Sequence, residues 1–322
     1  MAEKTDHNSA ASNPNRAFIR QAKSRPDYSL STLLHGLIYS NWPYLYIALG
    51  KGDHPIAKAL APIIEIWQRI FPAPPKSVMP DHSVNSPSRT FADEYHGKVL
   101  PLDQARQLIS VNEPINLPDL EHIVPYVKAR SIILENPDHI IALDCPCRAG
   151  QTDHCHPLKV CLVIGEPFTS QILQRYPEQS ESITQEEAVR IIEEEDQRGH
   201  VHHAFFKDAM LGRFYAICNC CDCCCGAIKA HKNNVPMLAS SGYIARVNPD
   251  LCQNCGLCVE YCQFNALIEH KDHVAPQASL CMGCGVCVNQ CAFNALELVR
   301  DESKGEPLEI MALMAQAAHE QP

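Results

Sequence analysis

Eight cysteines in the C-terminal part of the chain have a spacing that suits metal clusters. Each half of the set reads C-x2-C-x2-C-x3-C, first at Cys252, Cys255, Cys258 and Cys262, and again at Cys281, Cys284, Cys287 and Cys291. Three thiolates on one tight loop fit three corners of a [4Fe–4S] cubane, and the fourth corner then comes from the other half. The spacing therefore predicts one cluster on Cys252, Cys255, Cys258 and Cys291, and a second on Cys281, Cys284, Cys287 and Cys262.

The two halves form an internal repeat. With an offset of 29, residues 252–267 match residues 281–296 at ten of sixteen positions, including two Phe-Asn-Ala-Leu runs. Paired zinc knuckles are the alternative, but zinc needs four thiolates at each site and does not call for an interleaved set of eight. The pattern favours two iron–sulfur clusters.

Over roughly residues 242–300 the sequence resembles the bacterial two-cluster ferredoxin family. All eight cysteines match the ligand positions of that family, and the short spacer between Cys262 and Cys281 matches its compact form. The proline that usually follows the fourth cysteine of each half is replaced by Gln263 and Ala292. These replacements remove a rigid turn but no ligand, so the resemblance still implies two [4Fe–4S] clusters.

The other ten of the 18 cysteines form a second concentration upstream, at Cys145, Cys147, Cys155, Cys161, Cys218, Cys220, Cys221, Cys223, Cys224 and Cys225. An isolated buried cysteine is commonly an inert apolar residue, but ten thiols within about eighty residues indicate a shared purpose. Converging thiolates are soft ligands for iron–sulfur clusters or zinc. We expect one or two further iron–sulfur clusters, with ligands drawn alternately from both groups; structural zinc and metal-free redox-active thiols are the alternatives.

These upstream cysteines carry a second resemblance. A Cys-x-Cys-Arg segment at 145–148 and a Cys-Asn-Cys-Cys-x-Cys-Cys-Cys segment at 218–225 precede the ferredoxin unit. Over roughly residues 139–298 this order is similar to that of a group of cysteine-rich iron–sulfur binding proteins of anaerobic microbes. The resemblance implies electron transfer and supplies no substrate.

Polar residues near the upstream cysteines each allow two interpretations. Arg148 could donate hydrogen bonds to cluster sulfides or pair with Asp144. Five histidines could ligate metal or serve as solvated or helix-capping side chains, namely His154, His156, His200, His202 and His203. Glutamates 193–195 are interpreted as a solvated helix face.

Composition narrows the function class and the compartment. The chain has 322 residues and a formal net charge of −10. Nucleic-acid binding depends on neutralising phosphates, so we expect no nucleic-acid partner; redox partner proteins, with a basic surface, are expected instead. Thiols in metal-binding spacing indicate a reducing compartment. The polar first residues lack an apolar signal core, which predicts a cytoplasmic protein.

The first 144 residues contain no cysteine, so they can only help to position those that follow. We expect a disordered tail over 1–16, a helical region over 17–71, and a Pro-rich linker with short helices over 72–137, the helices at 102–109 and 119–130. Within the helical region, the apolar and aromatic stretch 30–49 is interrupted by polar residues and by Pro43. We interpret it as a packed helical subdomain, with peripheral membrane association or a subunit contact as the alternative. Residues 55–71 have apolar side chains at helical spacing.

A cysteine-rich α/β domain is expected over 138–240. Strands are predicted at 139–143, 159–164 and 214–217, and a helix at 184–197, with Thr184 as N-cap and Gly199 just beyond its end. The two-cluster ferredoxin domain follows over 241–300, and a short helix and tail over 301–322. The predicted fold class is α+β: a helical N-terminal region, a small cysteine-rich α/β domain and a C-terminal ferredoxin-type domain.

The sequence thus predicts an iron–sulfur electron-transfer protein. The surplus of cysteines over cubane corners keeps a second interpretation open, an oxidoreductase with an incompletely ligated cluster in the cysteine-rich domain that is fed by the ferredoxin clusters. A third interpretation is a metal-stabilised redox scaffold or sensor, which zinc in the cysteine-rich domain would favour.

Overall fold

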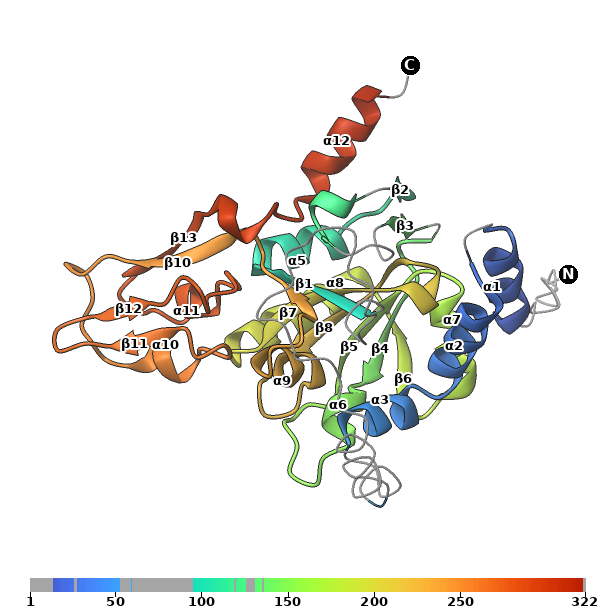
Figure 1. Ribbon diagram of the computed structural model, residues 1–322, viewed down its shortest axis with the longest axis horizontal. Coiled ribbons are helices and arrows are strands. Elements are labelled where there is room, and N and C mark those ends of the chain that lie inside the picture. The colour runs from blue at the N-terminus through green and yellow to red at the C-terminus, as the bar shows by residue number, and fades with distance from the viewer. Residues whose placement is uncertain are drawn as a thin grey trace, which may run out of the picture.

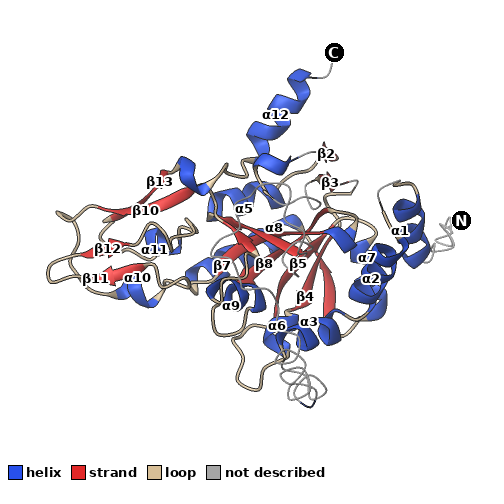
Figure 2. Cartoon of the chain, viewed as in Figure 1, coloured by secondary structure: helices blue, strands red, loops and turns tan. Residues whose placement is uncertain are grey.

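A computed structural model describes residues 14–25, 28–52, 59, 95–118, 120–125, 131–134 and 136–320. A seven-stranded sheet lies at the centre, helices cover both of its faces, and a smaller unit of two short sheets lies to one side (Figure 1, Figure 2). The predicted α+β class is confirmed.

The central sheet is almost entirely antiparallel. Its order is β6-β4-β5-β8-β7-β1-β9, and only β1 and β9 run parallel. The strands are β1 (Tyr95–Leu100), β4 (Ile140–Asp144), β5 (Lys159–Ile164), β6 (Ser180–Ile183), β7 (Val201–Lys207), β8 (Arg213–Cys220) and β9 (Leu238–Ala239).

Alternating side chains divide the interior into two cores. Along β4, Ile141 and Leu143 belong to one core while Ile140 and Ala142 belong to the other. This division follows from the strand geometry, which points successive side chains to opposite faces. Both faces of the sheet are covered, and for that reason β4, β5 and β7 are apolar over most of their length.

One face is covered by α5 (Leu102–Ile109), α8 (Gln185–Gln197) and α12 (Ile310–Glu320), together with the hairpin β2 (Ile115–Leu117) and β3 (Ile132–Leu134). Helix α8 begins with a capping box, in which the Thr184 hydroxyl accepts from the Glu187 amide and the Glu187 carboxylate accepts from the Thr184 amide. The predicted bounds of α5 and β5 agree with the structure, and the predicted helix 184–197 is confirmed as α8.

The other face carries the N-terminal helices α1 (Pro14–Lys23), α2 (Leu30–Asn41) and α3 (Pro43–Lys51). Helices α6 (Pro146–Ala149), α7 (Phe168–Arg175) and α9 (Gly226–Lys232) lie on the same face. Short 3-10 turns occur elsewhere, at Leu120–His122, Asp208–Met210 and Glu302–Lys304. The apolar stretch 30–49 is two helices, because Pro43 occupies the first turn of α3. Among the described residues, no helix combines the length and apolarity needed to cross a membrane.

The exposed side of α2 and α3 is apolar, with Leu30, Leu34, Ile38, Trp42, Leu45 and Leu49 all exposed. Side chains three to four residues apart share one side of a helix, so these form a stripe. Contact of this stripe with a membrane surface or a subunit stays a prediction.

The smaller unit contains two antiparallel pairs, β10 (Tyr243–Val247) with β13 (Leu296–Arg300) and β11 (Leu267–Glu269) with β12 (Val274–Pro276). Its helices α10 (Leu257–Glu260) and α11 (Val286–Asn289) occupy equivalent places in the two halves of the repeat. Buried apolar side chains of this unit are continuous with one core of the central sheet.

Several predictions about the N-terminal half need correction. The segment 72–137 supplies β1 to the interior of the sheet and also the β2–β3 hairpin, so it is more than a linker with short helices. In 119–130 the described residues form only the turn Leu120–His122, and residues 14–16 begin α1 instead of belonging to the tail. The helix predicted over 55–71, apart from residue 59, and the Pro-rich stretch 72–91 lie outside the described residues.

Candidate metal centres

The first ferredoxin set comprises Cys252, Cys255, Cys258 and Cys291. All four thiols line one cavity of about 80 Å³. Burial, together with repulsion from the neighbouring thiols of Cys291, Cys252 and Cys255, raises the pKa of Cys258 to about 11. Thiolates this close are stabilised only when positive charge lies between them, so the cavity fits an iron–sulfur core.

The second ferredoxin set comprises Cys281, Cys284, Cys287 and Cys262. Burial raises the pKa of Cys284 to about 12, and Cys262, Cys281 and Asp196 add negative charge nearby. Cys287 interacts with the other three members and also with Cys258 of the first set. The structure therefore brings together the same two interleaved groups of four that the spacing predicts.

The repeat extends to the backbone of both halves. Gly256 and Gly285 both have φ near +80° and precede α10 and α11. The amides of Ala266 and Ala295 donate to the Sγ atoms of Cys262 and Cys291, at 3.2 and 3.3 Å. The Ala245 amide donates to Cys281 Sγ at 3.4 Å. Such hydrogen bonds stabilise a thiolate and tune a cluster potential.

The ten upstream cysteines divide into two groups, and the first is a six-thiol set of Cys145, Cys147, Cys161, Cys218, Cys220 and Cys225. Cys161 Sγ and Cys218 Sγ are 3.8 Å apart. Cys145 interacts with Cys147 and Cys161, and Cys225 with Cys147 and Cys220, which connects all six thiols. They lie on one face of the sheet because Cys218 and Cys220 are two apart on β8, and β5 pairs with β8.

His203 lies beside the six-thiol set. The residue is fully buried, and neither ring nitrogen has a hydrogen-bond partner by distance and angle. A thiol contact from Cys225 and the nearby His203 imidazole together lower the pKa of Cys220 to about 6, against the effect of burial. On β7, His203 is opposite Cys218. Of the five candidate histidines, His203 is therefore the one that interacts with a thiol of the six-thiol set.

The N-terminal helices cover the six-thiol set, a role that the sequence did not reveal. The Tyr44 hydroxyl donates to the Asp144 carbonyl at 2.8 Å, and Lys51 Nζ donates to the Cys147 carbonyl at 3.1 Å. The first bond reaches the last residue of β4, and the second reaches α6. No motif marks Tyr44 or Lys51 in the sequence, because the contact joins residues about one hundred positions apart.

The second upstream group is a four-thiol group of Cys155, Cys221, Cys223 and Cys224. Its sulfur atoms all lie within 4.8 Å of one another. Cys223 Sγ is 3.1 Å from Cys155 Sγ, 3.2 Å from Cys221 Sγ and 3.6 Å from Cys224 Sγ. The expected alternation of adjacent cysteines separates Cys220 from Cys221, but Cys223 and Cys224 share this group because 222–224 form a turn and not a strand.

Arg148 and Glu195 form a buried ion pair behind these thiols. Arg148 also donates to the carbonyl of Asn219, which lies between Cys218 and Cys220, and the His200 ring contacts both partners. Two interpretations are corrected here. Arg148 pairs with Glu195 instead of Asp144, and Glu195 is buried while Glu193 and Glu194 are partly exposed, because the last turn of α8 faces the sheet.

The remaining histidines have other partners. His202 Nδ1 is 2.6 Å from Asn219 Oδ1, and the rings of His154 and His156 contact each other with centroids 4.6 Å apart. No described interaction links these three rings to a thiol.

The smaller unit of the fold, which holds the eight ferredoxin cysteines and is called the ferredoxin unit here, docks on the turn between α8 and β7. Gln263 Nε2 donates to the Gly199 carbonyl at 2.9 Å, and the Asp222 amide donates to Gln263 Oε1 at 2.8 Å. Asn289 Nδ2 donates to the Asp196 carboxylate at 3.0 Å. Gln263 occupies the position where the ferredoxin family usually has proline, and that departure is the sequence signal from which this contact could have been found.

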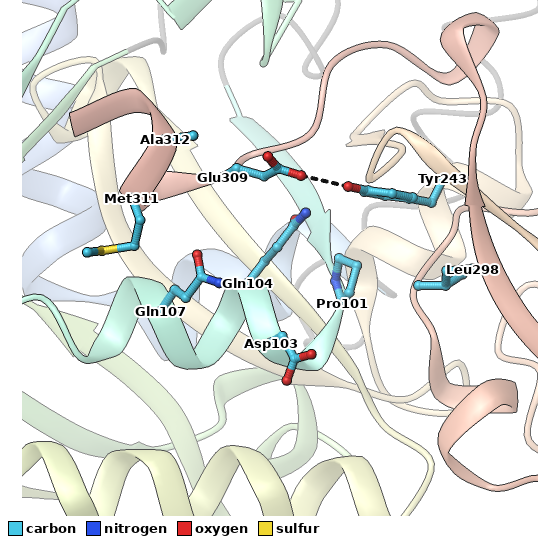
Figure 3. A pocket seen from close by; sticks show the side chains of 9 residues that line it. All are labelled: Pro101, Asp103, Gln104, Gln107, Tyr243, Leu298, Glu309, Met311 and Ala312. Atoms are coloured by element: carbon cyan, nitrogen blue, oxygen red, sulfur yellow. Dashed lines mark hydrogen bonds between the residues drawn. The ribbon is translucent and has the colours of Figure 1, made fainter. Parts of the chain in front are cut away.

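A groove of about 420 Å³ lies where α5, the ferredoxin strands and the start of α12 meet (Figure 3). Gln104 and Gln107 project from α5 toward Glu309, and the Tyr243 hydroxyl donates to Glu309 at 2.6 Å. No cysteine lines this groove. It is therefore separate from the four thiol sets.

Comparison with known proteins supports one part of this arrangement. Residues 245–268 match the 4Fe-4S binding domain family, a span that includes the first four ferredoxin cysteines. No curated protein matches the chain. The family match and the cysteine groups together indicate an iron–sulfur protein with an electron-transfer role and at least one 4Fe-4S cluster.

Proposed function

We propose that this protein passes single electrons through two [4Fe–4S] clusters in the ferredoxin unit and a further cluster on the six-thiol set. The observation that carries the proposal is the adjacency of the two interleaved sets, since Cys287 of the second set interacts with Cys258 of the first. When bound, such clusters supply one-electron redox chemistry, and their potentials depend on charge, burial and hydrogen bonds to sulfur.

The surroundings of the two ferredoxin sets differ in a way that suits a relay. The second set faces the central sheet, where the Asp196 carboxylate lies beside Cys284. The first set faces outward, because Cys255 is exposed and so are Leu257 and Phe293 near it. A redox partner protein would therefore exchange electrons at the first set, and the second set would connect to the cysteine-rich domain.

Asn219 and Arg148 support the further cluster. The Arg148 guanidinium is buried within reach of the six-thiol set and carries positive charge toward Cys145. Asn219 holds its side chain by donating to the Val160 carbonyl at 2.8 Å, which fixes the backbone between Cys218 and Cys220. Together these contacts pre-order thiols from β5 and β8.

Metal and sulfide content of the anaerobically purified full chain tests this proposal. About eight irons per chain are expected from the two ferredoxin clusters, and about twelve if the six-thiol set holds a third. EPR of the reduced protein should then show interacting paramagnetic clusters. Fewer than about eight irons in a folded, sulfide-replete sample would contradict the two-cluster assignment.

An oxidoreductase is the second candidate, favoured by one observation. The six-thiol set has more sulfur atoms than one cubane has corners, and the buried imidazole of His203 lies beside it. A cluster here could keep one iron free of protein ligands and so bind a substrate. An EPR signal that changes on adding a small ligand such as cyanide would favour the enzyme over the relay.

A further inference from the structure

The four-thiol group of Cys155, Cys221, Cys223 and Cys224 differs from the ferredoxin sets in the spacing of its sulfur atoms. Five sulfur pairs in the group are 3.1, 3.2, 3.5, 3.6 and 3.9 Å apart. Among the described residues, these four cysteines are the group of three or more potential metal ligands whose ligand atoms all lie within 4.8 Å of one another. The eight ferredoxin cysteines do not meet that distance.

These distances suit one ion better than a cubane. Four sulfurs placed tetrahedrally at about 2.3 Å from a zinc ion lie about 3.8 Å from each other. In a [4Fe–4S] cluster each thiolate binds a different iron at a different corner, so the four sulfurs must stand farther apart. The observed values bracket the tetrahedral spacing and leave no room for a cubane core.

We propose that the four-thiol group binds a single zinc ion in tetrahedral geometry, separate from the iron–sulfur clusters. Four cysteines occupy all four positions around a zinc ion and leave none for water, which is the donor set of a closed structural zinc site. One ligand, Cys155, comes from the loop after α6, and the other three come from the turn between β8 and α9. Zinc binding displaces the thiol protons and joins these two segments.

The neighbours of the group show what the ion would organise. Asp222 lies within the metal-binding turn, and its amide donates to the Gln263 side chain of the ferredoxin unit. Its carboxylate pairs with Lys232 at the end of α9 at 2.9 Å. Gln263 in turn is adjacent to Cys262, a member of the second ferredoxin set. The ion would thus fix the turn on which the ferredoxin unit docks.

Adjacent cysteines provide a matched pair of variants. Cys220 and Cys221 are both buried, and their interactions differ: Cys220 contacts Cys225 of the six-thiol set, and Cys221 contacts Cys223 and Cys155. We expect Cys221→Ser to lower zinc from about one per chain by at least about tenfold while iron is unchanged. Cys220→Ser should keep its zinc, whatever happens to iron.

Zinc and iron should be counted by mass spectrometry on the full chain, with zinc K-edge absorption on the unmodified protein. The expected spectrum has four sulfurs at about 2.3 Å and no neighbouring metal. The proposal would be overturned if the unmodified protein held no zinc, if its spectrum showed a neighbouring metal, or if Cys221→Ser lost iron. A single iron ion at this site would overturn the assignment to zinc. If the proposed electron relay is wrong, ferredoxin iron should be missing while zinc is retained. Because the absorption spectrum is taken on the unmodified protein, it tests the zinc site even if Cys221→Ser fails to fold.

Discussion

The ferredoxin unit and the cysteine-rich sheet gather their thiols by different means. In the ferredoxin unit three thiols of each set lie on one loop, and only the fourth comes from the other half of the repeat. In the sheet, the six-thiol set draws on β5, β8 and the ends of α6 and α9, and the four-thiol group joins a loop to a turn. Short-range spacing thus specifies the first arrangement, and strand order specifies the second.

The comparison also explains how the two regions are joined. The ferredoxin unit contacts the end of α8 through Asn289, Gln290 and Gln263, which are side chains from both halves of the repeat. At Gly199 a methyl group would overlap the ring of Tyr261. The second set is held against the sheet by these contacts, and the first set remains near the surface.

Loss of one buried thiol from a ferredoxin set should produce the largest effect. Cys258→Ala removes a buried ligand of the first set, so we expect about four of about eight ferredoxin irons to be lost. The matched variant Cys287→Ala should remove the second cluster instead. Iron content and EPR of both variants measure this, and equal loss of both cluster signals in Cys258→Ala would contradict independent sets.

Lys98 gives a pH-dependent contact between the regions. On β1 its ammonium donates to the Glu306 carbonyl, in the segment after the ferredoxin unit, at 2.6 Å. Burial and, to a lesser degree, the charge of Arg300 lower the pKa of Lys98 from 10.5 to about 7, against an opposing effect of Glu306. The unfolded chain therefore binds a proton that the folded chain has lost, between about pH 7 and 10.5.

The unfolding free energy should rise with pH in that window by up to about 1.4 kcal/mol per pH unit from this group. The penalty for burying the charge is complete below the folded pKa and disappears above the unfolded one. Chemical denaturation at pH 7, 8 and 9 measures the slope, with Lys98→Met as the control that lacks the titrating group. Parallel slopes for the two proteins would show that Lys98 is charged in the folded state.

Gly199→Ala should weaken the docking of the ferredoxin unit. Gly199 has φ of +81°, and the added methyl would overlap Tyr261. Gly52 has a similar φ of +75° in the left-handed helical region and open space around it, so Gly52→Ala carries only the conformational cost of about 1–2 kcal/mol. The difference in thermal denaturation midpoint between the variants isolates the contact, and equal midpoints would refute a tight interface.

Gln263→Pro should have the smallest effect of the four. The change restores the residue usual in the ferredoxin family and removes the two hydrogen bonds from Gln263 across the interface, to Gly199 and Asp222, each of which contributes about 0.5–1.5 kcal/mol. Faster hydrogen exchange at the Asp222 amide is expected, because that amide loses its acceptor. Ala292→Pro is the control, since Ala292 is exposed. If both variants leave Asp222 exchange unchanged, the Gln263 bond does not hold the interface.

Much of the local structure was predictable from the sequence. Helix α5, strand β5 and the Thr184 cap follow from short-range patterns, and the interleaved ferredoxin sets follow from cysteine spacing within one repeat. Strand β7 was missed because its His-His-Ala-Phe-Phe core has no clear alternation. It is buried along its whole length, and such strands show no polar side. Strand β1 was missed because a proline-rich stretch precedes it.

By itself, then, the sequence determined how the eight ferredoxin cysteines fall into two interleaved sets, because a loop of a few residues can place three thiols regardless of what surrounds it. Only the tertiary structure divided the upstream ten cysteines into sets of six and four. That division depends on β5 lying beside β8 and on a turn that brings Cys223 and Cys224 to the same side. The tertiary structure also buried Glu195 against Arg148 and placed α3 over the six-thiol set. Contacts between residues fifty to one hundred positions apart arise from packing, and a pattern of neighbours in sequence does not record them.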